Sequence, residues 1–328
     1  MPKVRWGLLS TANINRRLIP AIRASPRGEL VAVASRGAAN AAAYAAKWEI
    51  PQYFGSYSAM LDSGAIDAVY VSLPNHLHAE WTIAALHAGL HVLCEKPMAP
   101  TLEEVDAMIA VSQETGLVLA EAFMYRHHPQ MKITGKWVRQ GRLGEITLAR
   151  GVFNFAMGGR DNIRLNPEYG GGCLWDVGVY PLSFAQYVMG GPPESVYGVQ
   201  WLGDTGVDET FSGLLAYSGD RVAQIGSSFR SPFFTQAEVI GTEGRLVHDR
   251  PFIFGENRPT LTFYPRKGEP RPVAIPEMEL YSGEVEDMHA AILDGEASYL
   301  SLEETRDHVR TVLALYASAR QRQVVALE

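Results

Sequence analysis

Residues 68–73 read Ala68-Val69-Tyr70-Val71-Ser72-Leu73, a nearly continuous apolar run that decides the fold. A strand that is apolar on both sides is buried on both faces, as the strands of a parallel sheet are. A turn containing Pro74 and Asn75 follows, and then a segment from His78 to Ala88 that we interpret as a helix. The stretch therefore predicts one strand–turn–helix unit of an α/β domain.

The same unit recurs along the first part of the chain. Apolar runs predict further strands at residues 4–9, 29–35, 91–94 and 118–122. Apolar residues at helical spacing predict helices from residue 14 onward and over residues 38–47 and 102–115. This alternation predicts a doubly wound (Rossmann) parallel sheet in the first ~120 residues.

After Tyr125 the pattern changes to strands that follow one another with few helices between them. This is typical of an α+β domain with a large, mostly antiparallel, open-faced sheet. We therefore expect a dinucleotide-binding domain at residues 1–123 and an α+β domain at 124–328. A sheet with one open face commonly buries it against another subunit, so we expect a homodimer or homotetramer. The strands are predicted at 146–155, 194–202, 210–217, 222–229, 237–240 and 244–249, and the helices near 177–189, 283–293 and 302–322.

Composition excludes several classes of protein. A length of 328 residues corresponds to about two domains, and 47% hydrophobic residues is ordinary for a folded chain. The 29 basic and 36 acidic side chains give a net charge of −7 without a basic run, which argues against a nucleic-acid partner. Cys94 and Cys173 are the only thiols, so we expect no disulfide framework and a cytoplasmic location. No apolar stretch is long enough to predict a membrane span or an export signal.

The first strand-to-helix turn is the expected phosphate-binding turn of a dinucleotide site, because a helix amino terminus offers unpaired N–H groups there. A GxGxxG fingerprint is absent, and the turn reads Ser10-Thr11-Ala12-Asn13-Ile14. Small residues at Ser10 and Ala12 still allow a phosphate to approach the backbone. The alternative is an ordinary turn without a ligand.

The end of the second strand predicts which dinucleotide binds. An NAD site normally has a carboxylate there for the ribose hydroxyls, but the chain reads Ala34-Ser35-Arg36-Gly37. Arg36 can pair with a 2′-phosphate, and Ser35 can add a hydroxyl. The residues therefore favour NADP over NAD, with a solvated surface arginine as the alternative.

Two further segments lie at the carboxyl ends of predicted strands. The first is Leu73-Pro74-Asn75-His76-Leu77-His78, and the second is Glu95-Lys96-Pro97. We expect both at the cofactor edge, with His78 facing the cofactor at the start of a helix. His76 and His78 lack carboxylate or thiolate partners at a fitting spacing, so we predict no metal site.

These motifs carry a resemblance. Together with Asp176-Val177-Gly178-Val179-Tyr180, the Pro74-to-His78 and Glu95-Lys96-Pro97 segments resemble the Gfo/Idh/MocA family of NAD(P)-dependent oxidoreductases. Residues 121–130 and 162–172 are similar to its branch of NADP-dependent D-xylose 1-dehydrogenases and dimeric trans-1,2-dihydrodiol dehydrogenases. The resemblance implies two domains with a site between them, so that residues 124–328 form a substrate-binding and dimerisation domain. It also implies catalytic roles for Lys96 and Tyr180.

The implied pair suits the oxidation of an alcohol or hemiacetal. A tyrosine with a reference pKa of ~10 is a poor base at neutral pH, but a nearby ammonium lowers that value. In the reductive direction the tyrosine would donate the proton and the lysine would stabilise negative charge.

Other residues are assigned from their positions. Asp176 is expected either to orient sugar hydroxyls or Lys96, or to cap a helix that begins near residues 176–177. Arg164, in a loop rich in donors and glycine, and Phe155 are candidate substrate contacts, with a solvated loop and a core aromatic as the alternatives. Arg126 is a candidate neighbour of the cofactor.

We therefore expect an NADP-dependent oxidoreductase of a cyclic sugar or polyol, most simply an aldose 1-dehydrogenase of the D-xylose or D-glucose type. A trans-1,2-dihydrodiol dehydrogenase and a keto-sugar reductase are alternatives within the same chemistry. An NAD-dependent glycosidase and a non-catalytic nucleotide sensor are alternatives from other classes. Arg36 argues against the first of these two, and the presence of both Lys96 and Tyr180 against the second.

Overall fold

The computed structural model describes residues 2–159, 161–254 and 258–327. Its contacts divide the chain into two compact units, Met1–His127 with Met278–Arg306, and His128–Glu277 with Asp307–Glu328. The expected boundary after residue 123 lies close to the end of the first stretch. The segment Met278–Arg306 belongs to the first unit, whereas the sequence reading placed it in the second domain. The reason is that helix α9 (Ser282–Asp294) packs on the first unit, where the Trp6 indole donates to His289 Nε2 at 2.9 Å.

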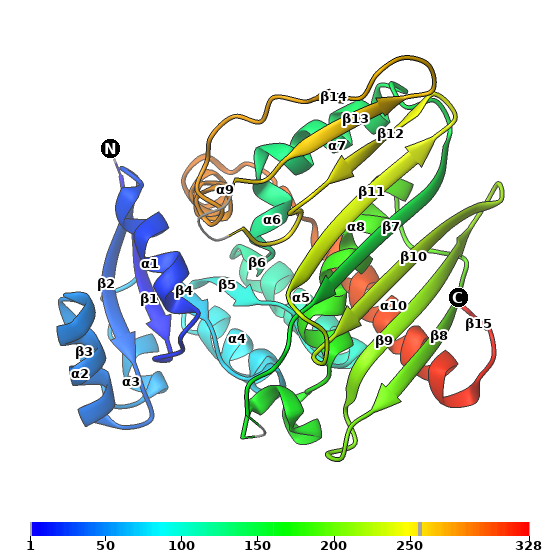
Figure 1. Cartoon of the computed structure of the whole chain (residues 1–328). Helices are drawn as coiled ribbons and strands as arrows, with labels where there is room; N and C mark the ends of the chain where they lie inside the picture. Colours follow the sequence, from blue (N-terminus) through cyan, green and yellow to red (C-terminus); the bar gives the residue numbers. More distant parts are fainter. Residues whose placement is uncertain (1, 160, 255–257, 328) are drawn as a thin grey trace. The chain divides into compact units, whose positions relative to one another are not determined.

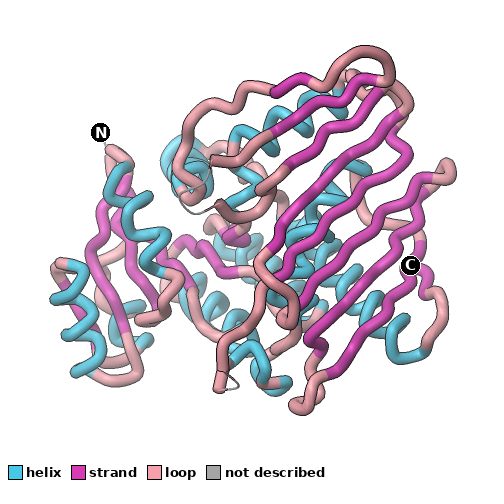
Figure 2. Tube along the Cα trace, in the orientation of Figure 1, coloured by secondary structure: helices cyan, strands magenta, loops and turns pink. Residues whose placement is uncertain are grey.

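The first unit contains the predicted parallel sheet. Its six strands lie in the order β3-β2-β1-β4-β5-β6, and every neighbouring pair is parallel. Figures 1 and 2 show this sheet with helices around it. The predicted strands and helices are confirmed to within a few residues, while β3, α3 and α6 were not predicted because such short elements show no periodicity. The strands are β1 (Val4–Leu9), β2 (Gly28–Ala34), β3 (Gln52–Phe54), β4 (Ala68–Val71), β5 (His91–Glu95) and β6 (Leu119–Ala122), and the helices are α1 (Asn15–Ala24), α2 (Ala38–Trp48), α3 (Tyr57–Leu61), α4 (His78–His87), α5 (Leu102–Thr115) and α6 (Met124–His127).

The strand order creates the ligand-binding edge of this unit. Strand β1 lies between β2 and β4, so the chain runs outward from β1 in both directions along the sheet. At such a switch point the loops that follow the two central strands diverge, and a crevice opens at their carboxyl ends. All four residues of β4 are fully buried, as the apolar run predicted.

The second unit contains a nine-stranded sheet with the order β14-β13-β12-β11-β7-β10-β9-β8-β15. Only the pair β7 and β10 is parallel, so the prediction of a mostly antiparallel sheet is confirmed. Helix α7 and the short strands β13 to β15 were not predicted. The strands are β7 (Ile146–Asn154), β8 (Ser195–Leu202), β9 (Asp208–Tyr217), β10 (Arg221–Ser228), β11 (Phe234–Gly241), β12 (Gly244–His248), β13 (Leu261–Pro265), β14 (Arg271–Pro272) and β15 (Val325–Ala326), and the helices are α7 (Pro129–Arg139), α8 (Val179–Met189) and α10 (Leu302–Gln321), which begins in the first unit.

Helices cover one face of the large sheet and leave the other open (Figure 2). Glycines on the covered face allow close packing, because a Cβ at Gly151 would meet Pro181 of α8 at 2.7 Å and a Cβ at Gly213 would meet Leu315 of α10 at 2.9 Å. On the open face Val199 and Leu214 are about half exposed. The pattern is the alternation expected of a sheet with one buried side.

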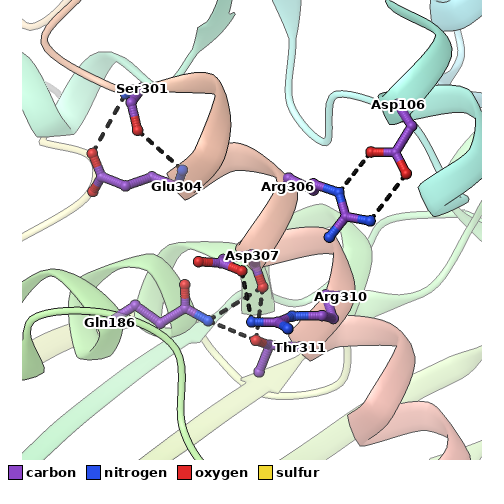
Figure 3. Close-up of polar contacts among 8 residues, drawn as sticks. All are labelled: Asp106, Gln186, Ser301, Glu304, Arg306, Asp307, Arg310 and Thr311. Atoms are coloured by element: carbon purple, nitrogen blue, oxygen red, sulfur yellow. Dashed lines mark hydrogen bonds and ion pairs between the residues drawn. The ribbon is translucent and has the colours of Figure 1, made fainter. Parts of the chain in front are cut away.

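Helix α10 begins in a network of polar contacts (Figure 3). Glu304 N donates to Ser301 Oγ at 3.1 Å and Ser301 N donates to Glu304 Oε2 at 3.4 Å, which is a capping box. Within the first unit, Arg306 forms a bidentate ion pair with Asp106 at 2.6 and 3.0 Å. These contacts fix the first turn of α10 against helix α5. No helix in the described ranges is long and apolar enough to cross a membrane.

Candidate active site

The turn after β1 is tied to the end of β4. Ser10 has a φ of 150°, a conformation that favours glycine, and its hydroxyl accepts from Ala12 N at 3.0 Å. The same hydroxyl lies 2.7 Å from Ser72 Oγ, and Asn15 Nδ2 donates to the Ser10 carbonyl at 2.9 Å. The side chains of Ser10 and Asn15 therefore shape the turn from inside, which leaves Thr11 to Ile14 partly or fully exposed before α1. A turn of this shape fits a pyrophosphate at the start of a helix.

The end of β2 carries an exposed cation. Ser35 is buried and its N–H donates to the Phe54 carbonyl at 3.1 Å, so the backbone here belongs to the sheet edge. Arg36 is exposed and, among the residues that the structure describes, forms no ion pair. Burial raises the pKa of Tyr57, and the charge of Arg36 acts in the opposite direction, which places the guanidinium near that ring. An uncommitted guanidinium at this edge fits the 2′-phosphate of NADP.

His78 lies deeper than the sequence suggested. It was expected to face the cofactor, but it is fully buried at the start of α4, after the 3-10 helix Asn75–Leu77. Its Nδ1 lies 2.9 Å from the Pro97 carbonyl and its Nε2 lies 2.8 Å from the Leu73 carbonyl. Burial lowers the pKa of His78, and the two carbonyls act in the opposite direction. Because both ring nitrogens contact backbone, His78 connects two loops instead of facing a ligand, whereas Pro74 and Asn75 are partly exposed.

The turn after β5 carries Lys96. The Tyr70 hydroxyl donates to Glu95 Oε1, and Lys96 N donates to Glu95 Oε2 at 3.2 Å. Burial raises the pKa of Glu95, and the ammonium of Lys96 opposes that rise. Lys96 is half-buried, and its backbone is anchored by the contact with Glu95.

Arg126 has a different position from the one expected. It lies in α6 with only 1% of its side chain exposed, and its guanidinium pairs with Glu304 Oε1 at 2.9 Å. The sequence predicted it as a neighbour of the cofactor from its position beside Tyr125. The structure places it in the core of the first unit, where its charge is committed to the start of α10.

In the second unit, Asp176 lies in the π-helical turn Leu174–Gly178, which runs directly into α8. Asp176 Oδ2 accepts from Arg164 Nε at 2.7 Å, so the structure brings these two candidates together. The alternative in which Asp176 caps a helix is wrong, because Cys173 and Gly178 occupy the capping positions. The helical segment also begins at Leu174, slightly earlier than predicted.

Tyr180 follows this turn and is buried among aromatic rings. Its ring centroid lies 5.4 Å from that of Phe153 and 5.7 Å from that of Phe252. Phe155, a candidate substrate contact, is half-buried and packs on Phe229 with centroids 5.2 Å apart. The aromatic contacts fix the plane of the Tyr180 ring, and Phe155 extends the apolar surface beyond Phe153.

The loop between Arg164 and the π-helical turn is more ordered than its glycines suggested. Gly171 N donates to the Asn166 carbonyl at 3.0 Å and Gly172 N donates to the Arg164 carbonyl at 2.9 Å. Gly172 has a φ of 125°, and a Cβ there would meet Asp208 Oδ1 at 2.1 Å. The glycines therefore allow close approach, and the loop holds Arg164 in place beside Asp176.

Asp208 is a residue of this region that the sequence reading missed. Its Oδ2 accepts from Leu174 N at 2.8 Å and from Cys173 Sγ at 3.1 Å, and its Oδ1 accepts from the Tyr316 hydroxyl at 2.7 Å. It thereby anchors the first residue of the π-helical turn. No sequence signal singles it out, because its partners come from two segments far from it in the chain, Cys173–Leu174 and Tyr316.

Glu284 of α9 is a buried acid that the sequence reading also missed. Neither carboxylate oxygen has a hydrogen-bond partner among the described residues, and only 1% of the residue is exposed. Burial raises the pKa of Glu284 well above its usual value, and the charges of Glu95 and Glu279 add to the rise. Burial therefore favours the protonated form of Glu284 in the folded protein.

We expect Glu284→Gln to stabilise the first unit in alkaline solution. The unfolded chain releases this proton near its ordinary pKa of 4.5, so the folded state binds more protons above that pH. The free energy of unfolding is therefore unaffected by this group below about pH 4.5, and it falls as pH rises from there toward the raised pKa of Glu284. The neutral amide removes this loss, so Tm of the variant should exceed that of the wild type at about pH 8. Each kcal/mol of difference in the free energy of unfolding should raise Tm by roughly 2–4 °C.

The difference should vanish near about pH 4.5, as measured by thermal unfolding over a pH series. Glu296→Gln, an exposed acid in the loop after α9, is the matched control and should leave Tm unchanged. A Tm difference for Glu284→Gln that is the same at every pH would contradict the protonated state.

Across the described ranges, no cluster of three His, Cys, Asp or Glu side chains has the arrangement of a metal site.

Comparisons with known proteins agree with this geometry. Residues 4–123 match the model of the oxidoreductase family with an NAD-binding Rossmann fold, and residues 132–247 match the GFO/IDH/MocA C-terminal domain. The chain is 37% identical to D-xylose 1-dehydrogenase (NADP(+)) 2 of Haloferax volcanii, over 98% of this chain and 99% of that protein.

Two solved structures are similar over almost the whole chain. The aldose-aldose oxidoreductase from Caulobacter crescentus, complexed with glycerol, has a TM-score of 0.92 at 26% identity and covers 99% of this chain and 100% of its own. KijD10, a 3-ketoreductase from Actinomadura kijaniata in complex with NADP and TDP-benzene, has a TM-score of 0.90 at 30% identity. The similarity covers 96% of this chain and 98% of KijD10.

Proposed function

The chain belongs to the GFO/IDH/MocA family of oxidoreductases, and from this premise we propose that it is an NADP-dependent dehydrogenase that oxidises carbon 1 of a cyclic aldose. The expected substrate is a sugar of the D-xylose or D-glucose type, and the product is the lactone. The observation that carries the proposal is the 37% identity to a D-xylose 1-dehydrogenase over nearly the full length of both chains.

The residues at the edge of the parallel sheet fit NADP. The shaped turn from Ser10 to Ile14 would hold the pyrophosphate at the start of α1, and Arg36 would hold the 2′-phosphate. Leu73, Pro74 and Asn75 follow strand β4, and Glu95 ends strand β5, at the same edge. When bound, NADP supplies the acceptor for the hydride that leaves carbon 1.

The chain's own residues would handle the proton and the charge. Tyr180 would accept the proton of the carbon 1 hydroxyl as the C=O bond forms, and would donate it in the reverse direction. Lys96 would stabilise negative charge on that same oxygen. Asp176, held by Arg164, would accept hydrogen bonds from sugar hydroxyls, and Phe155 would offer an apolar surface to the ring.

The test is a substrate panel with purified protein. Aldoses, inositols and trans-dihydrodiols are each mixed with NADP or NAD, and the absorbance of reduced nicotinamide is followed. We expect reduction of NADP with a pentose or hexose aldose. Turnover confined to dihydrodiols would favour the dihydrodiol dehydrogenase, and an absence of reduced cofactor with every compound would contradict a dehydrogenase altogether. Hydrolysis of a glycoside without net reduction would instead indicate a glycosidase.

A keto-sugar reductase is the second candidate. The similarity to KijD10, whose structure holds NADP and TDP-benzene, favours it. The same residues serve this reaction in reverse, with Tyr180 donating the proton to the carbonyl oxygen. Oxidation of NADPH by a keto sugar, with no activity on aldoses, would select this candidate.

We expect Arg36→Ala to raise the KM for NADP by roughly 10- to 100-fold, because charge-assisted hydrogen bonds contribute about 1.5–3 kcal/mol. The KM for NAD, which lacks the 2′-phosphate, should change little and serves as the internal control. Initial rates at varied cofactor concentration measure both. An equal change for the two cofactors would remove the assignment of Arg36.

We also propose that the open face of the large sheet joins copies of the chain in a homodimer or homotetramer. Val199 and Leu214 expose apolar surface there, and apolar residues are buried in stable interfaces. Light scattering should give the mass of an oligomer for the wild type and a lower mass for Leu214→Glu. Val324→Glu, which alters an exposed apolar residue outside the sheet, is the control.

We propose the cytoplasm as the location of the protein, in keeping with two buried thiols that form no disulfide.

A further inference from the structure

The backbone that carries Lys96 is held by side chains from several elements of the first unit. Glu95 precedes Lys96 and is held by the Tyr70 hydroxyl of β4. The two residues after Lys96 are held as well: the Pro97 carbonyl contacts His78 Nδ1 at 2.9 Å, and Met98 N donates to Glu121 Oε1 at 3.0 Å. The peptide groups around Lys96 are therefore restrained on both sides.

His78 joins this turn to a second loop of the cofactor edge. Its Nε2 lies 2.8 Å from the carbonyl of Leu73, which begins the loop after β4. The imidazole is fully buried, so water does not compete for either contact. One rigid ring thus lies between the loop after β4 and the turn after β5, and it donates to one of the two carbonyls when neutral and to both when protonated.

Glu121 connects the turn to helix α10. Only 3% of this residue is exposed, in strand β6, and its second oxygen, Oε2, accepts from Thr305 Oγ1 at 3.0 Å. Thr305 lies in the first turn of α10, which the capping box of Ser301 and Glu304 fixes (Figure 3). Through Glu121, the position of Met98 depends on a helix start more than 200 residues later in the chain.

We infer that His78 and Glu121 are positioning residues, which set the location of Lys96 by holding the carbonyl of Pro97 and the N–H of Met98 from opposite sides. The inference rests on the proposed role of Lys96. Its physical basis is that reacting groups must meet within a few tenths of an ångström, and a displacement of about 1 Å can cost roughly 100-fold in rate. Removing either side chain also leaves a buried backbone group without its partner.

The experiment compares four variants. His78→Phe removes both contacts of the imidazole but keeps a ring, and Glu121→Ala removes both contacts of the carboxylate. Glu121→Gln is the conservative variant, because its amide can still accept from Met98 N and donate to the Thr305 hydroxyl. His289→Phe is the matched control, since His289 is equally buried in the same unit and its side chain contacts Trp6, Ser25 and Glu286.

Two quantities are measured for each variant. Hydrogen–deuterium exchange of the peptide Cys94–Ala99 reports the restraint directly, and kcat with the best aldose reports its consequence. We expect His78→Phe and Glu121→Ala to exchange faster at this peptide and to lose roughly 10- to 100-fold in kcat. Glu121→Gln should recover most of both properties. His289→Phe should lower Tm while leaving the exchange of this peptide and kcat as in the wild type.

Unchanged exchange at Cys94–Ala99 in His78→Phe and Glu121→Ala would overturn the inference, as would an equal loss of kcat in His289→Phe. If His78→Phe fails to fold, the pair Glu121→Ala and Glu121→Gln gives the answer. Exchange needs no turnover, so it tests the restraint even if the wild type oxidises none of the sugars. Failure of the proposed function therefore remains distinguishable from failure of this inference.

Discussion

Tyr180→Phe is expected to lower kcat by roughly 10²- to 10⁴-fold, the range for removal of a general acid or base. The substitution deletes one hydroxyl and keeps the ring, which packs against Phe153 and Phe252. Folding and cofactor affinity should therefore be preserved. Steady-state kinetics give kcat, and quenching of tryptophan fluorescence gives the Kd of NADP.

The same change at Tyr187 is the control for this variant. Tyr187 lies on the same helix, α8, and its hydroxyl donates to the Met131 carbonyl at 3.4 Å, away from the proposed chemistry. Tyr187→Phe should keep wild-type turnover. A kcat for Tyr180→Phe within twofold of the wild type would reject Tyr180 as the group that moves the proton.

Lys96→Met is expected to lower kcat by roughly 10²- to 10³-fold, as loss of one group that stabilises developing negative charge does. Methionine keeps most of the length and apolar character of the side chain but removes the ammonium. The backbone contacts of the turn, from Lys96 N to Glu95 and from Met98 N to Glu121, do not involve the altered atoms. The loss should thus fall on kcat more than on the KM for the sugar.

A pH series separates this effect from a general disturbance. Without the ammonium, the dependence of kcat on pH should differ in shape from that of the wild type, because Lys96 no longer favours the charged form of its neighbours. Lys47→Met, an exposed lysine on α2, should show the wild-type profile. If Lys96→Met keeps both kcat and the profile, Lys96 has no role in the reaction.

The cofactor edge could be predicted because its residues follow strands directly. Ser10 follows β1, Arg36 follows β2 and Lys96 follows β5, and all carboxyl ends of a parallel sheet meet at one edge. Apolar periodicity located the strands, so it also located the residues after them. Arg126 was assigned from its position beside Tyr125 instead, and the structure buries it and pairs it with Glu304.

Residues that act through long-range contacts could not be predicted. Glu121 is a charged residue in an apolar run of the sequence. A charge in a buried strand needs a partner, and this is the single hint that the sequence offers about its role. Nothing in the sequence identifies that partner as Thr305 or places His78 against the Pro97 carbonyl. Asp208 is a similar case, since its contacts come from Leu174 and Tyr316.

The sequence by itself determined the parallel and mostly antiparallel sheets, the cofactor edge and the residue types available there, because local periodicity and strand ends are encoded by neighbouring residues. Only the tertiary structure decided which side chains reach that edge and which are committed to the core. His78 and Arg126 could have been surface groups by their spacing, yet burial and pairing place both inside the first unit. The reason is that a buried polar group must find a partner, and that partner can lie anywhere along the chain.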